Sequence, residues 1–513
     1  MTEYPTIEAT MSDAHAVLAA VCAANTLRDE TSKEHKATWG QFFTPLPIGT
    51  FMADWIDVPR RAVRILDLGA GTGVLGICAA QHALRSGAPA AHLVAVEREP
   101  LAVARLREAL QAAAASLGPE FTFDLVESDA LDLATPLLGS AALAPFDVAI
   151  SNPPYFKMSP SDPRGGGAPN AYARFMEVGS VLLRTGGQLI YIVPRSFASG
   201  LYFKGFRKDF HARMDLERVH AFDSRKDAFR CHEVLQENVI VAYRKGRSAS
   251  SEVAVTSSHG VADLGGARPR QHPRHTLLRP TDPHSVLFLP TSEADVAVMR
   301  TIFSWPRRLH SLKLEVSTGP VVPFRTEDLR SGDTGTTVPL LWLQHIVDGG
   351  VTWPLPGGFR KDEHIEAAAG PKLLVPNDTY ILIRRFSAKE DPRRLMLGVL
   401  RRGDLPGRMV GLENHVNFIH RPCGQLDDEL ATGLAAVLLS TIVDDFFRIQ
   451  SGNTQVSATE LRALPLPEET ALRTIGKTIL AEGPTGLADH AQVDRVVEDH
   501  LALPNRGRTH DRS

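Results

Sequence analysis

The chain has 513 residues, 43% of them hydrophobic, and a formal net charge of −3 at pH 7. This length allows two or three domains, and the composition is that of an ordinary globular protein. The near-neutral charge excludes a uniformly basic nucleic-acid-binding protein, so a nucleic-acid partner would need local basic patches. The four cysteines have no paired spacing, so we expect no disulfide framework, no metal site and a reducing, cytoplasmic location.

The N-terminal residues 1–37 are expected to form a helical segment. The Ala-rich stretch 14–24 has no basic flank, which favours a helix over a signal peptide. The longest apolar stretch, residues 433–443, is too short to cross a bilayer. We therefore expect no membrane association.

A glycine-rich turn follows the first predicted strand. Three of the four residues at 63–66 are β-branched or aliphatic, the motif DLGAGTG occupies 67–73, and a helix is predicted from Val74 to about Arg85. Glycines let a backbone approach a ligand closely, and the helix amino end offers free N–H donors. Nicotinamide and flavin sites share this pattern, so the motif alone leaves the nucleotide open.

Polar residues also follow the next three predicted strands, at Glu97, Asp129 and Asn152. Counted from Asp67, the intervals are 30, 32 and 23 residues, which fits one strand–helix unit each. The carboxyl ends of parallel strands form the ligand-binding edge of an α/β sheet, where Glu97 suits a ribose and Asp129 an adenine amino group. Each acid alone can be a helix cap or a solvated turn, but the series predicts a nucleoside site.

The tetrapeptide Asn152-Pro153-Pro154-Tyr155 directly follows the fourth predicted strand. Its rigid amide can present a fixed acceptor to an amino group while the aromatic ring stacks on a flat base. If the Asn152 side-chain oxygen and the Pro153 carbonyl each accept an N–H, the nitrogen lone pair is freed for methyl transfer. The tetrapeptide thus predicts methylation of a planar nitrogen, with an ordinary turn as the alternative.

Together these motifs resemble the adenine-N6 DNA methyltransferases of type II restriction–modification systems in which the cofactor motif precedes the catalytic motif and a target-recognition domain follows. The segment GQFFTP at 40–45 is similar to the one that closes over S-adenosylmethionine in this group, and the match spans roughly residues 38–245. The resemblance implies cofactor contacts from Thr44, Asp67, Gly69, Gly71, Glu97 and Asp129, and a catalytic loop of Asn152, Pro153, Pro154 and Tyr155.

The resemblance also implies the fold, an α/β class I S-adenosylmethionine-dependent methyltransferase with a Rossmann-like, mostly parallel seven-stranded sheet and a C-terminal α+β DNA-recognition domain. The second wall of the base pocket would be Leu235 or Phe229, and the sequence does not choose between them. Composition shifts predict five parts: an N-terminal segment at 1–37, a catalytic domain at 38–258, a linker at 259–285, a target-recognition domain at 286–467 and a fraying tail at 468–513.

Residues 384–402 carry seven Lys and Arg against two acids, and residues 201–250 carry eleven against seven. Either stretch can be a solvated face. By resemblance to the recognition half of certain restriction–modification methyltransferases, Arg384 and Arg385 are candidates to contact guanine edges. Asn453 and Gln455 are better explained as phosphate contacts or loop tethers than as adenine contacts.

The sequence therefore predicts a site-specific methyltransferase that moves a methyl group from S-adenosylmethionine to N6 of a flipped-out adenine in double-stranded DNA. It would protect host DNA against a cognate restriction endonuclease that acts on the same site. The alternatives are an N-methyltransferase acting on RNA or a protein glutamine, and a catalytically inactive DNA-binding regulator. The intact Asp67, Glu97, Asp129 and Asn152 argue against the regulator.

Overall fold

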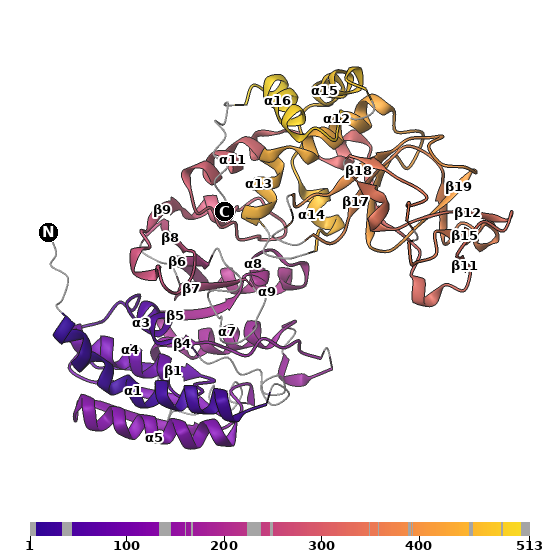
Figure 1. Ribbon diagram of the computed structural model, residues 1–513. Helices are drawn as coiled ribbons and strands as arrows, with labels where there is room; N and C mark the ends of the chain where they lie inside the picture. Colours follow the sequence, from indigo (N-terminus) through magenta and orange to yellow (C-terminus); the bar gives the residue numbers. More distant parts are fainter. Residues whose placement is uncertain are drawn as a thin grey trace. The chain divides into compact units, whose positions relative to one another are not determined.

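Contacts between residues divide the chain into two compact units, Met1–Thr291 and Ser292–Ser513 (Figure 1). The computed structural model describes residues 7–32, 44–132, 145–159, 161–165, 168–222, 237–246, 250–347, 349–357, 359–387, 391, 393–450, 455–483 and 486–503.

The first unit is built on a nine-stranded sheet with the strand order β3-β2-β1-β4-β5-β7-β6-β8-β9. Strands β1 to β5 are parallel, whereas β7 runs antiparallel between β5 and β6. The strands are β1 (Val63–Leu68), β2 (Ala91–Glu97), β3 (Phe121–Glu127), β4 (Phe146–Ser151), β5 (Leu183–Pro194), β6 (Met214–Phe222), β7 (Asn238–Lys245), β8 (Glu252–Ser258) and β9 (Arg270–Pro273).

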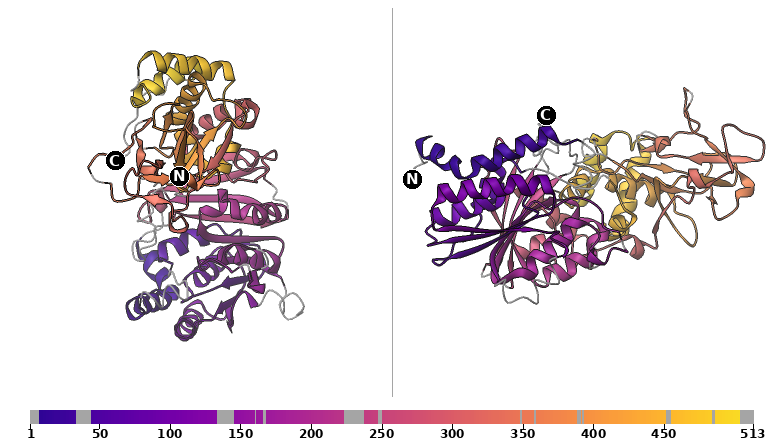
Figure 2. Two further views of the ribbon diagram at one scale, coloured as in Figure 1. Left: turned by 90° about the vertical axis from the view of Figure 1, so that its right-hand side faces the viewer. Right: turned by 90° about the horizontal axis from the view of Figure 1, so that it is seen from below.

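Helices cover both faces of this sheet. One face packs against α1 (Ile7–Glu30), α3 (Leu46–Ala53), α4 (Val74–Arg85) and α5 (Pro100–Leu117), and α1 lies along α5 (Figure 2). The other face packs against α7 (Ala171–Leu182), α8 (Ser196–Ser199) and α9 (Lys204–His211).

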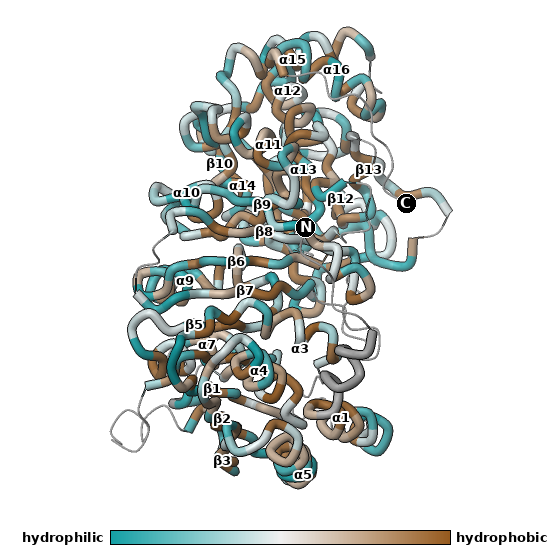
Figure 3. Tube along the Cα trace, turned by 90° about the vertical axis from the view of Figure 1, so that its left-hand side faces the viewer, coloured by the Kyte–Doolittle hydropathy of each residue, from teal (hydrophilic) through white to brown (hydrophobic). Residues whose placement is uncertain are grey.

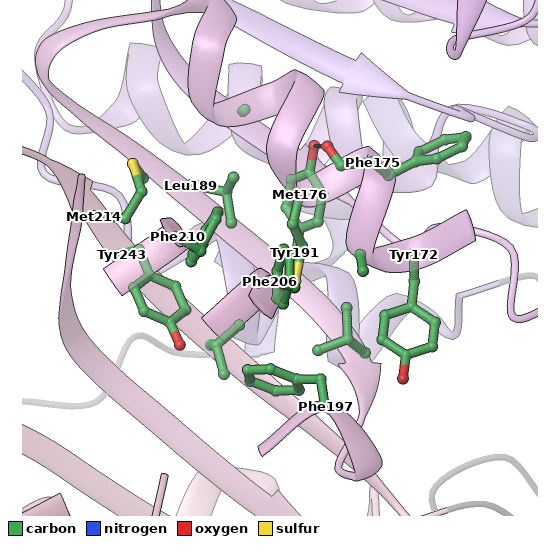
Figure 4. Packing of buried hydrophobic residues seen from close by; sticks show 14 of the residues in the cluster. Tyr172, Phe175, Met176, Leu189, Tyr191, Phe197, Phe206, Phe210, Met214 and Tyr243 are labelled. Atoms are coloured by element: carbon green, nitrogen blue, oxygen red, sulfur yellow. Dashed lines mark hydrogen bonds between the residues drawn. The ribbon is translucent and has the colours of Figure 1, made fainter. Parts of the chain in front are cut away.

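The core of the second face is aromatic. Tyr172 and Phe175 from α7, Tyr191 from β5, and Phe206 and Phe210 from α9 lie together with buried aliphatic residues (Figure 4). Because helices cover both faces, the central strands are apolar on both sides, as the hydropathy of β5 and β7 shows (Figure 3). This is the mostly parallel α/β sheet that the sequence predicts, extended by two strands.

The linker prediction was wrong. Within residues 259–285, β9 pairs with β8, and α10 (Arg274–Leu277) follows it. The apolar side chains of Leu264 and Leu277 are buried, so this segment completes the first unit, which ends at Thr291. A four-residue edge strand with the sequence RQHP has too little apolar content to be recognised by its pattern.

The second unit combines three small sheets with helices, as expected for an α+β domain. A four-stranded sheet has the order β10-β20-β17-β18, a five-stranded sheet the order β11-β15-β12-β19-β16, and β13 pairs with β14. The strands are β10 (Glu315–Thr318), β11 (Leu329–Arg330), β12 (Thr337–Leu341), β13 (Ile346–Val347), β14 (Gly350–Val351), β15 (His364–Glu366), β16 (Leu374–Pro376), β17 (Tyr380–Arg384), β18 (Leu397–Leu400), β19 (Met409–Leu412) and β20 (Val416–His420).

Two helices lie within the described part of residues 468–503, which corrects the prediction of a tail that frays from residue 468. A Cβ added at Gly433 would lie 1.8 Å from the carbonyl oxygen of Leu472, and one at Gly476 would lie 1.9 Å from that of Glu429. These glycines let α12 (Asp428–Leu439) and α15 (Glu469–Ala481) pack backbone to backbone. The polar residues of α15 led the sequence analysis to expect no folded helix there. The helices are α11 (Glu293–Ser304), α12 (Asp428–Leu439), α13 (Thr441–Gln450), α14 (Ala458–Ala463), α15 (Glu469–Ala481) and α16 (His490–Leu501).

Within the residues described, no single helix has the length and apolar character needed to cross a membrane. The bent pair of α12 and α13 meets the criterion jointly, by length and composition only.

The buried side chain of Asp147, near the start of β4, connects three parts of the chain through hydrogen bonds. The Asp147 carboxylate accepts from Arg61, from Arg184 Nε at 2.5 Å and from the backbone N–H of Arg64 at 2.9 Å. Burial alone would raise the pKa of Asp147, but these hydrogen bonds outweigh it and lower the pKa below its ordinary value of 3.8.

Replacing Asp147 with asparagine is expected to lower the free energy of unfolding at pH 7 by about 1–3 kcal/mol, because charge-assisted hydrogen bonds are lost. A depressed folded-state pKa means that the carboxylate stabilises the fold above its unfolded pKa and that this stabilisation is lost as the pH falls through the folded value. The difference in melting temperature between wild type and D147N should therefore shrink below about pH 4. An equal difference at pH 7 and pH 3 would contradict this account.

Candidate cofactor and catalytic site

Four residues expected at strand ends follow neighbouring strands of the first unit, at the carboxyl edge of its sheet. Asp67 lies in β1 opposite Ala95 of β2 and Ile150 of β4. Glu97 ends β2, Asn152 follows β4, and Asp129 stands two residues beyond β3. The structure therefore brings the predicted nucleoside ligands and the catalytic tetrapeptide to one edge of the sheet.

The turn after β1 brings the backbone around Asp67. Gly69 and Gly71 have φ values of 70° and 57°, which other residues adopt only with strain. The N–H of Gly71 donates to Glu97 Oε2 at 2.8 Å, so the glycine turn is joined to the end of β2. A Cβ at Gly69 would lie 3.2 Å from the Phe175 ring, which leaves little room for a side chain there.

Asp67 is a buried carboxylate with one oxygen available. Only 1% of the residue is exposed, and its Oδ2 accepts from the N–H of Gly76 at 2.9 Å. Its Oδ1 is buried and has no hydrogen-bond partner in the described structure. Burial raises the pKa of Asp67 to about 7. An unpaired buried acceptor of this kind fits an ammonium donor such as the amino group of an amino-acid ligand.

Glu97 is oriented by the backbone N–H groups of neighbouring segments. Its Oε1 accepts from the N–H groups of Arg98 at 2.8 Å and Glu99 at 3.0 Å, and its Oε2 accepts from Gly71. A carboxylate has about four acceptor positions, so at least one remains for a ribose hydroxyl.

Asp129 is paired with two arginines that the sequence did not single out. Its Oδ2 accepts from Arg98 Nη1 at 2.7 Å and from Arg164 Nη1 at 3.2 Å, and its Oδ1 accepts from the N–H of Leu131 at 2.9 Å. Arg164 belongs to the segment after the catalytic tetrapeptide and also binds Asp162. The ion pair of Asp129 and Arg164 therefore connects the end of β3 with the segment that follows the predicted catalytic tetrapeptide.

The amide of Asn152 is fixed at both ends. Its Nδ2 donates to Thr44 Oγ1 at 3.1 Å, and its Oδ1 accepts from the Tyr155 hydroxyl at 2.8 Å. The same hydroxyl lies 3.3 Å from the carbonyl oxygen of Ile192 in β5. The amide oxygen therefore turns toward Tyr155 and the amide nitrogen toward Thr44.

Tyr155 packs on the aromatic core. Its ring meets that of Tyr172 edge to face with centroids 6.1 Å apart, and burial raises the pKa of its hydroxyl. The sequence did not predict the hydrogen bond from the Tyr155 hydroxyl to Asn152. The stacking of the Tyr155 ring on a base stays a prediction. Leu235 and Phe229, the candidates for the opposite wall, lie outside the residues described.

In the second unit, Arg384 and Arg385 both bind acceptors of the chain itself. Arg384 donates from Nη2 and Nε to the carbonyl oxygen of Ile346, at 2.6 and 3.1 Å. Arg385 donates from Nη1 to the carbonyl oxygen of Asn414 at 3.1 Å. Their contact with guanine stays a prediction, and Asn453 lies outside the described residues. Where the structure is described, no group of three or more His, Cys, Asp or Glu residues could hold a metal ion.

Comparison with known proteins places the chain in a family. Residues 124–229 match the model of the Eco57I restriction-modification methylase. Over 493 residues the chain is 31% identical to the type II methyltransferase M.PstI of Providencia stuartii, covering 94% of this chain and 96% of that protein. Over 496 residues it is 32% identical to the type II methyltransferase M.BsuBI of Bacillus subtilis, covering 92% of this chain and 96% of that protein.

A solved structure confirms the fold class. The type IIL restriction-modification enzyme MmeI, solved in complex with DNA, aligns over 99% of this chain and 77% of its own with a TM-score of 0.53 and 11% sequence identity. The two relatives exceed 30% identity over nearly the whole chain. The chain therefore belongs to the family of type II methyltransferases that includes M.PstI and M.BsuBI.

Proposed function

We propose that the protein is a cytoplasmic, site-specific DNA methyltransferase that transfers a methyl group from S-adenosylmethionine to N6 of an adenine flipped out of double-stranded DNA. The observation that carries the proposal is the Asn152 amide, held by Thr44 and Tyr155 at the same edge of the sheet as Asp67 and Glu97. Membership in the type II methyltransferase family supports DNA as the substrate.

The residues around the glycine turn fit S-adenosylmethionine. The unpartnered Oδ1 of Asp67 would accept from its amino group, Glu97 would bind the ribose hydroxyls and Asp129 the adenine amino group. S-adenosylmethionine supplies an activated methyl group, so the task of this chain is to position the acceptor nitrogen.

Asn152 and Pro153 would prepare that nitrogen. An adenine amino group is a poor nucleophile because its lone pair is delocalised into the ring. If Asn152 Oδ1 and the Pro153 carbonyl oxygen each accept one N–H, the nitrogen becomes tetrahedral and its lone pair points at the methyl group. The Asn152 amide oxygen has two lone pairs, one of which accepts from the Tyr155 hydroxyl at 2.8 Å.

The Thr44 hydroxyl is expected to control the orientation of the Asn152 amide. Replacing Thr44 with valine removes the acceptor for Nδ2 at nearly constant volume, and kcat should fall roughly 5–10-fold, the equivalent of one hydrogen bond of about 1 kcal/mol. Thr44→Ser keeps the hydroxyl and should restore most of the activity.

Binding of S-adenosylmethionine to the Thr44 variants, measured by calorimetry, separates this role from a contact with the cofactor. A valine variant with normal kcat and weakened cofactor binding would contradict the orienting role. It would leave Thr44 as a cofactor contact alone.

The substrate class can be tested with S-adenosylmethionine labelled in its methyl group. Purified protein is offered unmethylated duplex DNA, RNA and denatured cellular protein in separate reactions. Label should enter the duplex DNA alone. Label in RNA or protein would favour the alternative N-methyltransferases, and cofactor binding without transfer to any of the three would favour the inactive regulator. If the enzyme protects a host, DNA that it has methylated should resist a restriction endonuclease specific for the same site.

A further inference from the structure

Three chain segments meet at one end of the four-stranded sheet in the second unit. Strand β17 ends there and β20 begins there, because Arg384 pairs with Val416. The N–H of Arg385 then donates to the carbonyl oxygen of His415 at 2.9 Å. Phe386 forms a β-bridge with Gln455, which adds the third segment. Side chains distant in sequence are thus collected at this end of the sheet.

Two rings at this end are in contact and exposed. The centroids of Phe386 and His415 lie 5.2 Å apart with the ring planes tilted by 54°. Phe386 is 42% exposed, and so is the His415 side chain. An apolar ring in contact with a polar one, both open to solvent, offers a partner a flat apolar face and a hydrogen-bonding atom together.

The buried carboxylate of Glu413 fixes the orientation of the His415 imidazole. Glu413 is fully buried, and its carboxylate accepts from His415 Nδ1 and from the His415 backbone N–H at 3.0 Å. Because a carboxylate only accepts, Nδ1 must hold a proton, and Nε2 is the ring atom left for an external partner. This arrangement fixes the direction of one polar atom, which a contact with a specific base requires.

Hydrogen bonds within the chain also fix the guanidinium of Arg385. Besides its bond to Asn414, Arg385 lies against the Gln455 amide. With that amide oriented so that its oxygen faces the guanidinium, the oxygen accepts from Arg385 Nε at 2.6 Å and from Nη2 at 2.7 Å. Among the residues the structure describes, no salt bridge neutralises Arg385, so its positive charge favours an anionic partner. Most of its donors are already used, so Arg385 supplies charge rather than the contact that distinguishes one base from another.

We propose that Phe386 and His415 form a pair that contacts the edge of a base in the recognition sequence of double-stranded DNA, with Glu413, Arg385 and Gln455 as its support. This inference rests on the proposed function. A phosphate oxygen only accepts hydrogen bonds and offers no apolar surface, whereas an apolar ring beside one fixed polar atom suits a base edge, which presents hydrogen-bonding groups and, in thymine, a methyl group. Phe386 supplies the apolar contact and His415 Nε2 the hydrogen bond.

The test compares His415→Ala and Phe386→Ala with His500→Ala, which removes an exposed histidine bonded to Thr478 on the helical side of the same unit. Each variant methylates the same unmethylated genomic DNA, and methylated positions are mapped by sequencing. The two test variants should accept other bases at one position of the recognition sequence, with the preference there reduced roughly 5-fold or more. Glu413→Gln should relax the same position, and His500→Ala should leave the sequence unchanged.

Two results would overturn the base contact. One is an unchanged recognition sequence in His415→Ala, Phe386→Ala and Glu413→Gln. The other is a uniform loss of affinity for all sequences with a shallower salt dependence, which indicates a phosphate contact. Wild-type protein that methylates no DNA would instead refute the proposed function, so the two failures are distinguishable.

Discussion

Replacing Asn152 with alanine is expected to lower kcat for methyl transfer roughly 10²–10³-fold, the usual effect of removing one preorganised polar group from a transition state. Alanine removes the amide oxygen that would accept from the target amino group, as well as the bonds to Thr44 and Tyr155. The affinity for S-adenosylmethionine should stay within a few-fold of wild type, because Asp67 and Glu97 are untouched. Single-turnover kinetics with labelled cofactor, together with calorimetry, measure the two quantities separately.

Asn152→Asp is the matched control. It keeps an oxygen acceptor for the target amino group but loses the Nδ2 donor to Thr44. Its kcat should lie between those of wild type and the alanine variant. If alanine retained more than about a tenth of the wild-type kcat, the role of Asn152 as the acceptor would have to be abandoned.

Replacing Asp67 with asparagine is expected to weaken binding of S-adenosylmethionine at least roughly 30-fold, because a buried charged partner of its amino group is lost. The buried carboxylate of wild type has a pKa raised to about 7. Cofactor affinity of the wild type should therefore improve as the pH rises through about 7 and the carboxylate ionises. The asparagine variant should lack that pH dependence, and calorimetry between pH 6 and pH 8 compares the two proteins.

Replacing Asp67 with asparagine is expected to weaken cofactor binding but to stabilise the cofactor-free fold at high pH. A raised carboxyl pKa means that the folded protein favours the protonated form, so this contribution to stability is present below the ordinary value of 3.8 and is lost as the pH rises through about 7. Without cofactor, D67N should therefore melt higher than wild type at pH 8, with the difference disappearing by about pH 3.5, below the ordinary pKa of 3.8. A variant that melts lower than wild type at both pH values would show that Asp67 serves the fold rather than the ligand.

The strand-end residues were predictable from the sequence because a regular structure imposes their spacing. One strand–helix unit per interval put Asp67, Glu97 and Asn152 at the same edge of the sheet, and the structure places them there. The contacts of Asp129 were not predictable, since Arg164 is 35 residues away in the sequence and no periodic pattern relates the two positions.

The C-terminal part shows a second limit of sequence patterns. Polarity marked the residues after 467 as a tail, yet Gly433 and Gly476 allow α12 and α15 to approach backbone to backbone. Glycine within a helix ordinarily weakens it, so a glycine that enables close packing looks the same in a single sequence as one that breaks structure. The support of His415 by Glu413 was likewise hidden, because the sequence does not show that Glu413 is buried.

Mass spectrometry of the modified nucleoside tests the central claim most directly. Wild-type protein and Asn152→Ala are each incubated with S-adenosylmethionine and unmethylated genomic DNA, and the digested nucleosides are quantified while the methylated positions are mapped by sequencing. We expect N6-methyladenine, confined to one short sequence, in the wild-type reaction and almost none with the variant. Methylation of cytosine, or no methylated base despite measurable cofactor binding, would contradict the assignment of this protein as an adenine-N6 DNA methyltransferase.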